Sequence, residues 1–141
     1  MIALYWISIF NVKQFLLKFS LMRILIVDDE TKIADALSER LSLRGFDPTP
    51  VYDGGAALQR LQKETFDAVL LDLRLPDIDG SEVLKQALEW FPGLRVVILS
   101  GHASEQEFKS LLRQGASACF QKPAKIQELV EALSGGREDL G

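Results

Sequence analysis

The stretch VLLDLRLPDIDG, residues 69–80, ends an apolar run with a carboxylate, Asp72, and continues into a loop-like sequence. A short, uninterrupted apolar run is typical of a β-strand that is buried on both faces of a parallel sheet. The Pro, Gly and additional Asp residues that follow are typical of a loop. The stretch therefore predicts a strand over 67–72 with an acid at its carboxyl end.

Similar strand-like segments alternate with helix-like segments along the chain. The predicted strands are 23–27, 46–52, 67–72, 95–100 and 118–122, and the predicted helices are 31–45, 55–64, 81–90, 104–115 and 124–135. Strand–helix units in this alternation predict an α/β fold, a doubly wound parallel sheet with helices on both faces. Pro48 and Pro50 cannot donate ladder hydrogen bonds, so their strand is expected at a sheet edge. Placing it outermost gives the strand order 2-1-3-4-5 of flavodoxin-like sheets.

The size and charge of the chain restrict its class. It has 141 residues, of which 48% are hydrophobic and 26% are charged, as expected for one globular domain with a substantial core. Its net charge of −4 argues against direct nucleic-acid binding, which depends on clustered Lys and Arg. Cys119 is the single cysteine, so no intramolecular disulfide can form and a cytoplasmic location is expected.

Residues 1–21 differ from the rest, because they are apolar and aromatic and carry only two charges, both lysines. They lack the basic start and the small-residue cleavage site of a secretory signal. Their uninterrupted apolar run is shorter than the roughly 20 residues needed to span a bilayer, so no membrane span is expected. We interpret them as a translation-start artefact or a loosely attached helix, with an interfacial amphipathic helix as the alternative. The domain is predicted over 22–134, with a flexible tail over 135–141.

Acidic residues follow two of the predicted strands. Asp28 and Asp29 come directly after the first strand, and Asp72 ends the third. In the order 2-1-3 these strands are neighbours, and their carboxyl ends flank the crevice where such sheets bind ligands. Helix capping would explain one of the two adjacent acids, and Asp72 has no helix start to cap. The sequence therefore predicts that three carboxylates converge at this edge.

Converging carboxylates repel one another, so a cation is expected beside them. Lys122 ends the fifth strand and has a stem long enough to cross the top of the sheet, although an ordinary surface lysine is the alternative. Three Asp and one Lys leave two negative charges, which one Mg²⁺ balances with carboxylate and water ligands. Ser100 ends the fourth strand at the same rim and offers a hydroxyl, or is a simple turn residue.

These residues together resemble the receiver domain of two-component response regulators, over roughly residues 22–134. The motifs that carry the resemblance are ILIVDDE, LLDLRLPDIDG, ILSGHAS and QKP, in that order on successive predicted strand ends. The resemblance implies that Asp72 is a phosphoacceptor, supplied by a sensor histidine kinase or a histidine phosphotransfer protein. It also implies that Asp29, Asp72 and the backbone carbonyl of Arg74 bind Mg²⁺, with Asp28 acting mainly through water.

The resemblance gives roles to the remaining polar residues of the motifs. Lys122 and Ser100 would contact the oxygens of the transferred phosphoryl group. Arg74 and His102 would influence how long that group survives. The resemblance further implies a downstream protein target, and a homodimer through the face formed by segments 104–115, 118–122 and 124–135 is a further expectation.

One position departs from the family pattern. The family usually carries Tyr or Phe three residues before the lysine, and this chain has Cys119 there. Phe120 follows directly, but one step along a strand reverses the face, so its ring is expected on the opposite side of the sheet. The family's aromatic switch is therefore not expected here, and Cys119 is interpreted as a small buried hydrophobe.

The first functional reading is a stand-alone receiver that is phosphorylated and signals through a partner protein; the receiver part of a longer regulator is a variant of it. The second is a Mg²⁺-dependent hydrolase of the aspartyl-phosphate type. Such enzymes usually place another Asp two residues after the nucleophile, where this chain has Arg74. The third is a degenerate receiver that only binds a partner, against which the intact set of three acids, Lys122 and Ser100 argues.

Overall fold

The computed structural model describes residues 21–135, and within them strands and helices alternate as predicted. The strands are β1 (Arg23–Val27), β2 (Asp47–Val51), β3 (Ala68–Leu71), β4 (Arg95–Ser100) and β5 (Ala118–Gln121). The helices are α2 (Thr31–Ser42), α3 (Gly54–Lys63), α4 (Gly80–Trp90), α5 (Glu105–Arg113) and α6 (Ile126–Ser134). The strands form one parallel sheet in the order β2-β1-β3-β4-β5, which confirms the predicted fold class.

The two prolines of β2 explain why this strand lies at the edge. The backbone amide of Asp47 donates to the carbonyl of Met22 at 2.8 Å, so Asp47 faces β1 with its N–H group. Successive residues of a strand alternate in this respect, which turns the nitrogens of Pro48 and Pro50 toward the outer side. β2 can therefore pair with β1 on one side only, as the sequence predicted.

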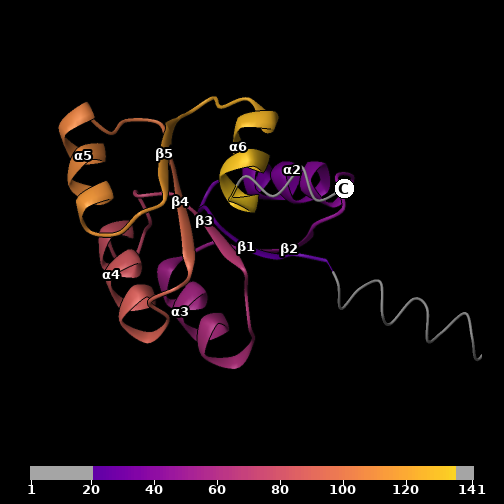
Figure 1. Ribbon diagram of the computed structural model, residues 1–141, viewed down its shortest axis with the longest axis horizontal. Helices are drawn as coiled ribbons and strands as arrows, with labels where there is room; N and C mark the ends of the chain where they lie inside the picture. The colour runs from indigo at the N-terminus through magenta and orange to yellow at the C-terminus, as the bar shows by residue number, and fades with distance from the viewer. Residues whose placement is uncertain (1–20, 136–141) are drawn as a thin grey trace, which may run out of the picture.

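Helices cover both faces of the sheet (Figure 1). One layer contains α2 and α6, and the other contains α3, α4 and α5. Side chains of β1 alternate between the two cores: Leu25 and Val27 pack toward α3 and α4, whereas Ile24 and Ile26 pack toward α2 and α6. This is the two-faced burial that continuous apolar strands require, and it leaves the strand ends for polar side chains.

Cys119 and Phe120 lie on opposite faces of β5, as predicted. Cys119 packs against the core beneath α5, with its Sγ 3.8 Å from the carbonyl oxygen of Phe108. Phe120 packs in the layer of α2 and α6. Burial raises the pKa of the Cys119 thiol to about 11, so the thiol is uncharged at neutral pH and behaves as a small apolar group.

Element boundaries differ slightly from the predicted ones. β3 ends at Leu71 and β5 at Gln121, so Asp72 and Lys122 are the first residues after their strands. α4 begins at Gly80, and its N-cap is Asp79, whose carboxylate accepts the Ser81 amide at 2.9 Å. Most of the predicted extension and tail lies outside the described residues. Within residues 21–135, no helix has the length and apolar character needed to cross a membrane.

Candidate functional site

Two neighbouring strands bring the predicted acids together. Asp28 follows β1 and Asp72 follows β3, and these strands pair in register, with Val27 opposite Leu71. The Asp72 amide also donates to the Val27 carbonyl at 2.9 Å, which fixes the start of the loop that leaves β3. Asp28, Asp29 and Asp72 each offer one carboxylate oxygen, and these oxygens lie within 4.8 Å of one another. The predicted convergence of three carboxylates is therefore present.

The acids differ in burial and in local hydrogen bonding. Asp28 and Asp72 are only 3% and 6% exposed, whereas Asp29 is exposed. Asp28 Oδ1 accepts the amide of Glu30 at 2.9 Å, and Asp72 Oδ1 accepts the amide of Leu73 at 2.8 Å. The N-cap of α2 is Glu30, which makes no side-chain capping hydrogen bond. Helix capping by Asp28 or Asp29 is thus the wrong explanation for the two adjacent acids.

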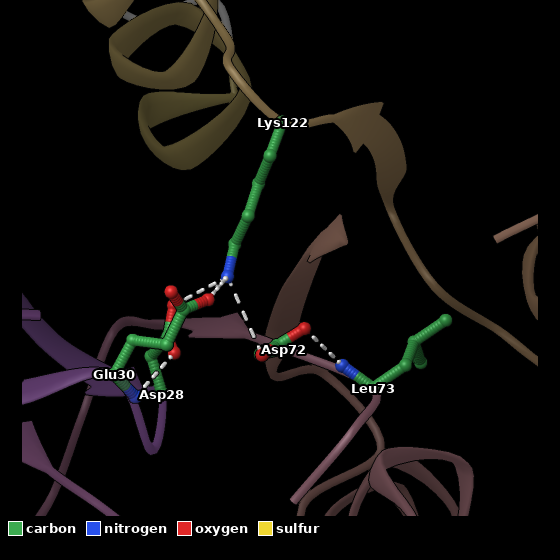
Figure 2. A network of polar contacts seen from close by, with 5 residues as sticks. All are labelled: Asp28, Glu30, Asp72, Leu73 and Lys122. Carbon is green, nitrogen blue, oxygen red and sulfur yellow. Dashed lines mark hydrogen bonds and ion pairs between the residues drawn. The ribbon is translucent and has the colours of Figure 1, made fainter. Parts of the chain in front are cut away.

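Lys122 crosses the top of the sheet to reach the acids, as Figure 2 shows. Its Nζ lies 2.8 Å from Asp28 Oδ2 and 3.4 Å from Asp72 Oδ2. The side chain is 15% exposed, so the alternative of an ordinary surface lysine is wrong. A third carboxylate, Glu30, lies 3.2 Å from the same Nζ through its Oε1. Sequence reasoning did not single out Glu30, although it is the last acid of the ILIVDDE motif.

Burial and charge act in opposite directions on these groups. Burial raises the pKa of the Asp72 carboxyl; the Lys122 ammonium opposes this rise and the Asp28 carboxylate adds to it. Burial alone would lower the pKa of Lys122, but its hydrogen bond and ion pair with Asp28, and its attraction to Asp72, raise it. Lys122 is therefore protonated at neutral pH. One ammonium does not offset the clustered acids, so the site has the charge and oxygen ligands that suit a divalent cation.

Ser100 lies at the same rim and is 1% exposed. Its Oγ has no hydrogen-bond partner among the described residues, which is unusual for a buried hydroxyl. An unsatisfied buried polar group costs about 1–3 kcal/mol, so the arrangement is one that a ligand oxygen would improve. The Lys122 amide donates to the Ser100 carbonyl at 2.8 Å, which joins the ends of β4 and β5.

Arg74 and His102 are both exposed and lie near one another. Arg74 Nη2 is 3.4 Å from the carbonyl oxygen of His102, which is a long contact between the loops after β3 and β4. The backbone of Arg74 also pairs with Asp79 in an isolated antiparallel bridge. Arg74 thus belongs to a loop with its own internal structure, which the sequence pattern did not predict.

Comparisons with known proteins agree with this architecture. A family model described as the response regulator receiver domain matches residues 24–134. The regulatory protein VanRc of Enterococcus gallinarum is 36% identical over 110 residues, which are 77% of this chain and 46% of that protein. The response regulator MprA of Mycobacterium avium is 33% identical over 112 residues, which are 79% of this chain and 49% of that protein. The chain therefore spans about half the length of the curated relatives it matches.

Solved structures of receiver domains also resemble this fold. The CheY-like response regulator receiver domain protein from Methanospirillum hungatei JF-1 superposes with a TM-score of 0.78 at 33% sequence identity. That match covers 85% of this chain and 99% of that one. The receiver domain of the Francisella response regulator 1452 superposes with a TM-score of 0.77 at 27% identity. The fold is thus shared with known receiver domains.

Proposed function

The chain belongs to the response regulator receiver family, and from this premise we propose that it accepts a phosphoryl group on Asp72 and passes the signal to a partner protein. The observation that carries the proposal is the cluster of three carboxylates, with oxygens within 4.8 Å of one another, beside the Lys122 ammonium. Three carboxylates and one ammonium at the carboxyl ends of the strands suit a site that binds a metal ion and a phosphoryl group.

The proposed metal is Mg²⁺, held by the carboxylates of Asp29 and Asp72 and by the backbone carbonyl of Arg74. Asp28 is given a water-mediated role, because its two oxygens already engage Lys122 and the Glu30 amide. Carboxylate, carbonyl and water oxygens are the ligands that Mg²⁺ prefers. When bound, Mg²⁺ supplies positive charge that stabilises the charge on the transferring phosphoryl oxygens.

Asp72 Oδ2 is the proposed nucleophilic atom. Its Oδ1 is occupied by the Leu73 amide, whereas Oδ2 faces Lys122 at 3.4 Å. Oδ2 attacks the phosphorus atom of a phosphohistidine, the P–N bond breaks, and the imidazole nitrogen leaves with the electron pair. The product is an acyl phosphate on Asp72, which carries about −2 of charge where the free carboxylate carried −1.

Lys122 and Ser100 are proposed to hold the phosphoryl oxygens. The Lys122 ammonium is already within reach of Asp72, and the buried Ser100 hydroxyl gains the hydrogen-bond partner that it lacks among the described residues. Because the backbones of these two residues are hydrogen-bonded to each other, a shift of either one moves the ends of β4 and β5. The face formed by α5, β5 and α6 is the proposed surface for a downstream protein or a second copy, through which such a shift is sensed.

The experiment that tests the proposal is intact mass after incubation with acetyl phosphate and Mg²⁺. The wild type should gain one phosphate, and Asp72→Ala should gain none. Asp35→Ala, which removes an exposed acid on α2, is the matched control and should behave like the wild type. Chelation of Mg²⁺ should abolish uptake. Lack of uptake by the wild type, or equal uptake by Asp72→Ala, overturns the proposal and in the first case favours a domain that only binds a partner.

The receiver part of a longer regulator is the second candidate, and the half-length match to the curated relatives favours it. In that case the downstream partner is a domain of the same polypeptide. An immunoblot of the protein from its own cells separates the two, since a band near 15.8 kDa supports a separate receiver and a band about twice that size supports the longer protein. The hydrolase alternative predicts steady phosphate release from small esters, which we do not expect, because Arg74 stands where such enzymes place a second Asp.

A further inference from the structure

The loop that follows Asp72 is closed at its base. The Gly80 amide donates to the Leu73 carbonyl at 2.8 Å, and Arg74 bridges to Asp79. A Cβ atom on Gly80 would lie 2.5 Å from the Asp72 carbonyl oxygen, so only glycine allows the two ends of the loop to approach this closely. The loop therefore leaves β3 and returns to begin α4 at nearly the same point.

The tip of this loop is attached to a different element, the start of α3. Asp77 Oδ1 accepts the amide of Gly54 at 2.9 Å, and Asp77 Oδ2 accepts the amide of Gly55 at 2.7 Å. These amides belong to the first turn of α3, where a helix has no partners of its own for its N–H groups and where its dipole favours a negative charge. The two hydrogen bonds hold the pKa of the Asp77 carboxyl below its ordinary value.

Ile78 adds a steric contact beside this attachment. A Cβ atom at Gly54 would collide with the Ile78 side chain, which packs at the place that glycine leaves open. The loop tip is thus fixed by two hydrogen bonds and one close apolar contact. Each contact joins the loop that carries Arg74 to a residue at least 22 positions away in the sequence.

Helix capping does not by itself explain the contacts of Asp77 with α3. The helix has its own N-cap, Asp53, whose Oδ1 accepts the Ala56 amide at 2.7 Å. Asp77 is exposed, and its carboxylate accepts the amides of Gly54 and Gly55, which do not donate to Asp53. The two acids therefore support the same helix end, but only Asp77 also restrains the loop after the phosphoacceptor.

We propose that Asp77 is a positioning residue for the metal site: anchored on α3, it holds the loop so that the Arg74 carbonyl keeps the place from which it binds Mg²⁺. The inference rests on the proposed function, because it takes the Arg74 carbonyl as a metal ligand. Without the anchor, the loop samples more conformations and must be ordered when the metal binds. Residues that orient metal ligands typically change metal affinity by 10- to 100-fold, and for an exposed anchor we expect about tenfold.

The test is a Mg²⁺ titration of the full chain by isothermal titration calorimetry, for the wild type, Asp77→Ala and the matched control Asp53→Ala. Each variant removes one carboxylate that accepts amides from the first turn of α3, so both should lower the melting temperature by similar amounts. Asp77→Ala should raise the Kd for Mg²⁺ about tenfold, whereas Asp53→Ala should leave it within about twofold. Asp77→Asn keeps one acceptor oxygen and should fall between the wild type and Asp77→Ala.

A second readout separates positioning from general destabilisation. At saturating Mg²⁺, phosphate uptake by Asp77→Ala from acetyl phosphate should return to the wild-type rate, and below saturation it should be slower. Wild-type Mg²⁺ affinity in Asp77→Ala, or equal weakening by Asp53→Ala, overturns the inference and leaves the phosphoacceptor role of Asp72 intact. Absence of Mg²⁺ binding by the wild type, or unchanged binding in Asp72→Ala, overturns the proposed function itself.

Discussion

The two ends of the parallel sheet each carry acids around a cation, and the two clusters differ in burial. At the amino end, Arg23 contacts Glu64 at 2.7 Å and Asp47 at 3.5 Å, and these three side chains are 25–31% exposed. At the carboxyl end, Lys122 contacts Asp28 and Asp72, whose side chains are 4% and 7% exposed. The residue types are alike, but water screens the first cluster far more than the second.

The directions of the pKa shifts show what this difference means. Hydrogen bonds from Arg23 and Arg60 lower the pKa of Glu64, so its charge is favoured in the folded protein. Burial raises the pKa of Asp72, so its charge is disfavoured there despite the nearby ammonium. By these directions, the charge on Glu64 adds to the stability of the fold, whereas the charge on Asp72 subtracts from it and remains available to a ligand.

Removing the cation from each cluster should give the largest contrast. Lys122→Met and Arg23→Met both keep an aliphatic stem and lose the charge. Without metal, Lys122→Met leaves buried carboxylates unpaired and should lower the free energy of unfolding by about 3 kcal/mol, against about 1 kcal/mol for Arg23→Met. Urea denaturation with chelator measures both. Mg²⁺ should restore much of the loss in Lys122→Met and none in Arg23→Met; equal losses, or equal rescue, contradict the contrast.

Neutralising one acid in each cluster should change stability in opposite directions. At pH 7 and without metal, Asp72→Asn should raise the free energy of unfolding by about 1 kcal/mol, whereas the partly exposed Glu64→Gln should lower it. The ordinary pKa values of Asp72 and Glu64 are 3.8 and 4.5. Urea denaturation of both variants from pH 3 to pH 7 tests this prediction.

The pH dependence follows from the signs of the two shifts. The pKa of Asp72 is raised on folding, so its contribution to stability is complete below pH 3.8 and is lost as the pH rises through the folded value. The pKa of Glu64 is lowered, so its contribution is present above pH 4.5 and is lost as the pH falls through the folded value. Both variants should therefore approach the wild type at low pH, and a destabilised Asp72→Asn at pH 7 contradicts the assignment.

Glu30 should give the smallest effect, because it is more exposed than the acids of either cluster although it lies at the carboxyl end. Its side chain is 58% exposed, so Glu30→Gln should change the free energy of unfolding by less than about 0.5 kcal/mol. Urea denaturation with chelator measures this change beside that of Asp72→Asn. A loss of unfolding free energy as large as that in Lys122→Met would contradict this prediction and show that Glu30 contributes as much as the buried acids.

Much of the fold followed from local patterns in the sequence. Continuous apolar runs identified β1, β3 and β4, because burial on both faces requires apolar residues at successive positions. Pro48 and Pro50 identified the edge strand, because proline has no N–H group to donate. The convergence of Asp28 and Asp72 followed from topology alone, since strand ends meet at a known rim. The reach of Lys122 followed from its position after the last strand.

Two contacts were not predictable in the same way. The Glu30 carboxylate meets Lys122 across 92 positions, through side-chain conformations that no local pattern specifies. The Asp77 carboxylate meets the start of α3 only because the loop after Asp72 folds back on itself. Both depend on how two loops lie against each other in space. Strand periodicity and turn composition carry no information of that kind.

The prolines of β2 also affect how this molecule meets its neighbours. The outer side of β2 presents carbonyl oxygens but no N–H groups at Pro48 and Pro50. A strand of another polypeptide could donate hydrogen bonds to these carbonyl oxygens. It would receive none in return from Pro48 and Pro50, although strand addition requires alternating donors and acceptors. Sheet extension into a neighbouring copy is therefore blocked at this end, which protects a crowded or newly synthesised population from aggregation through β2.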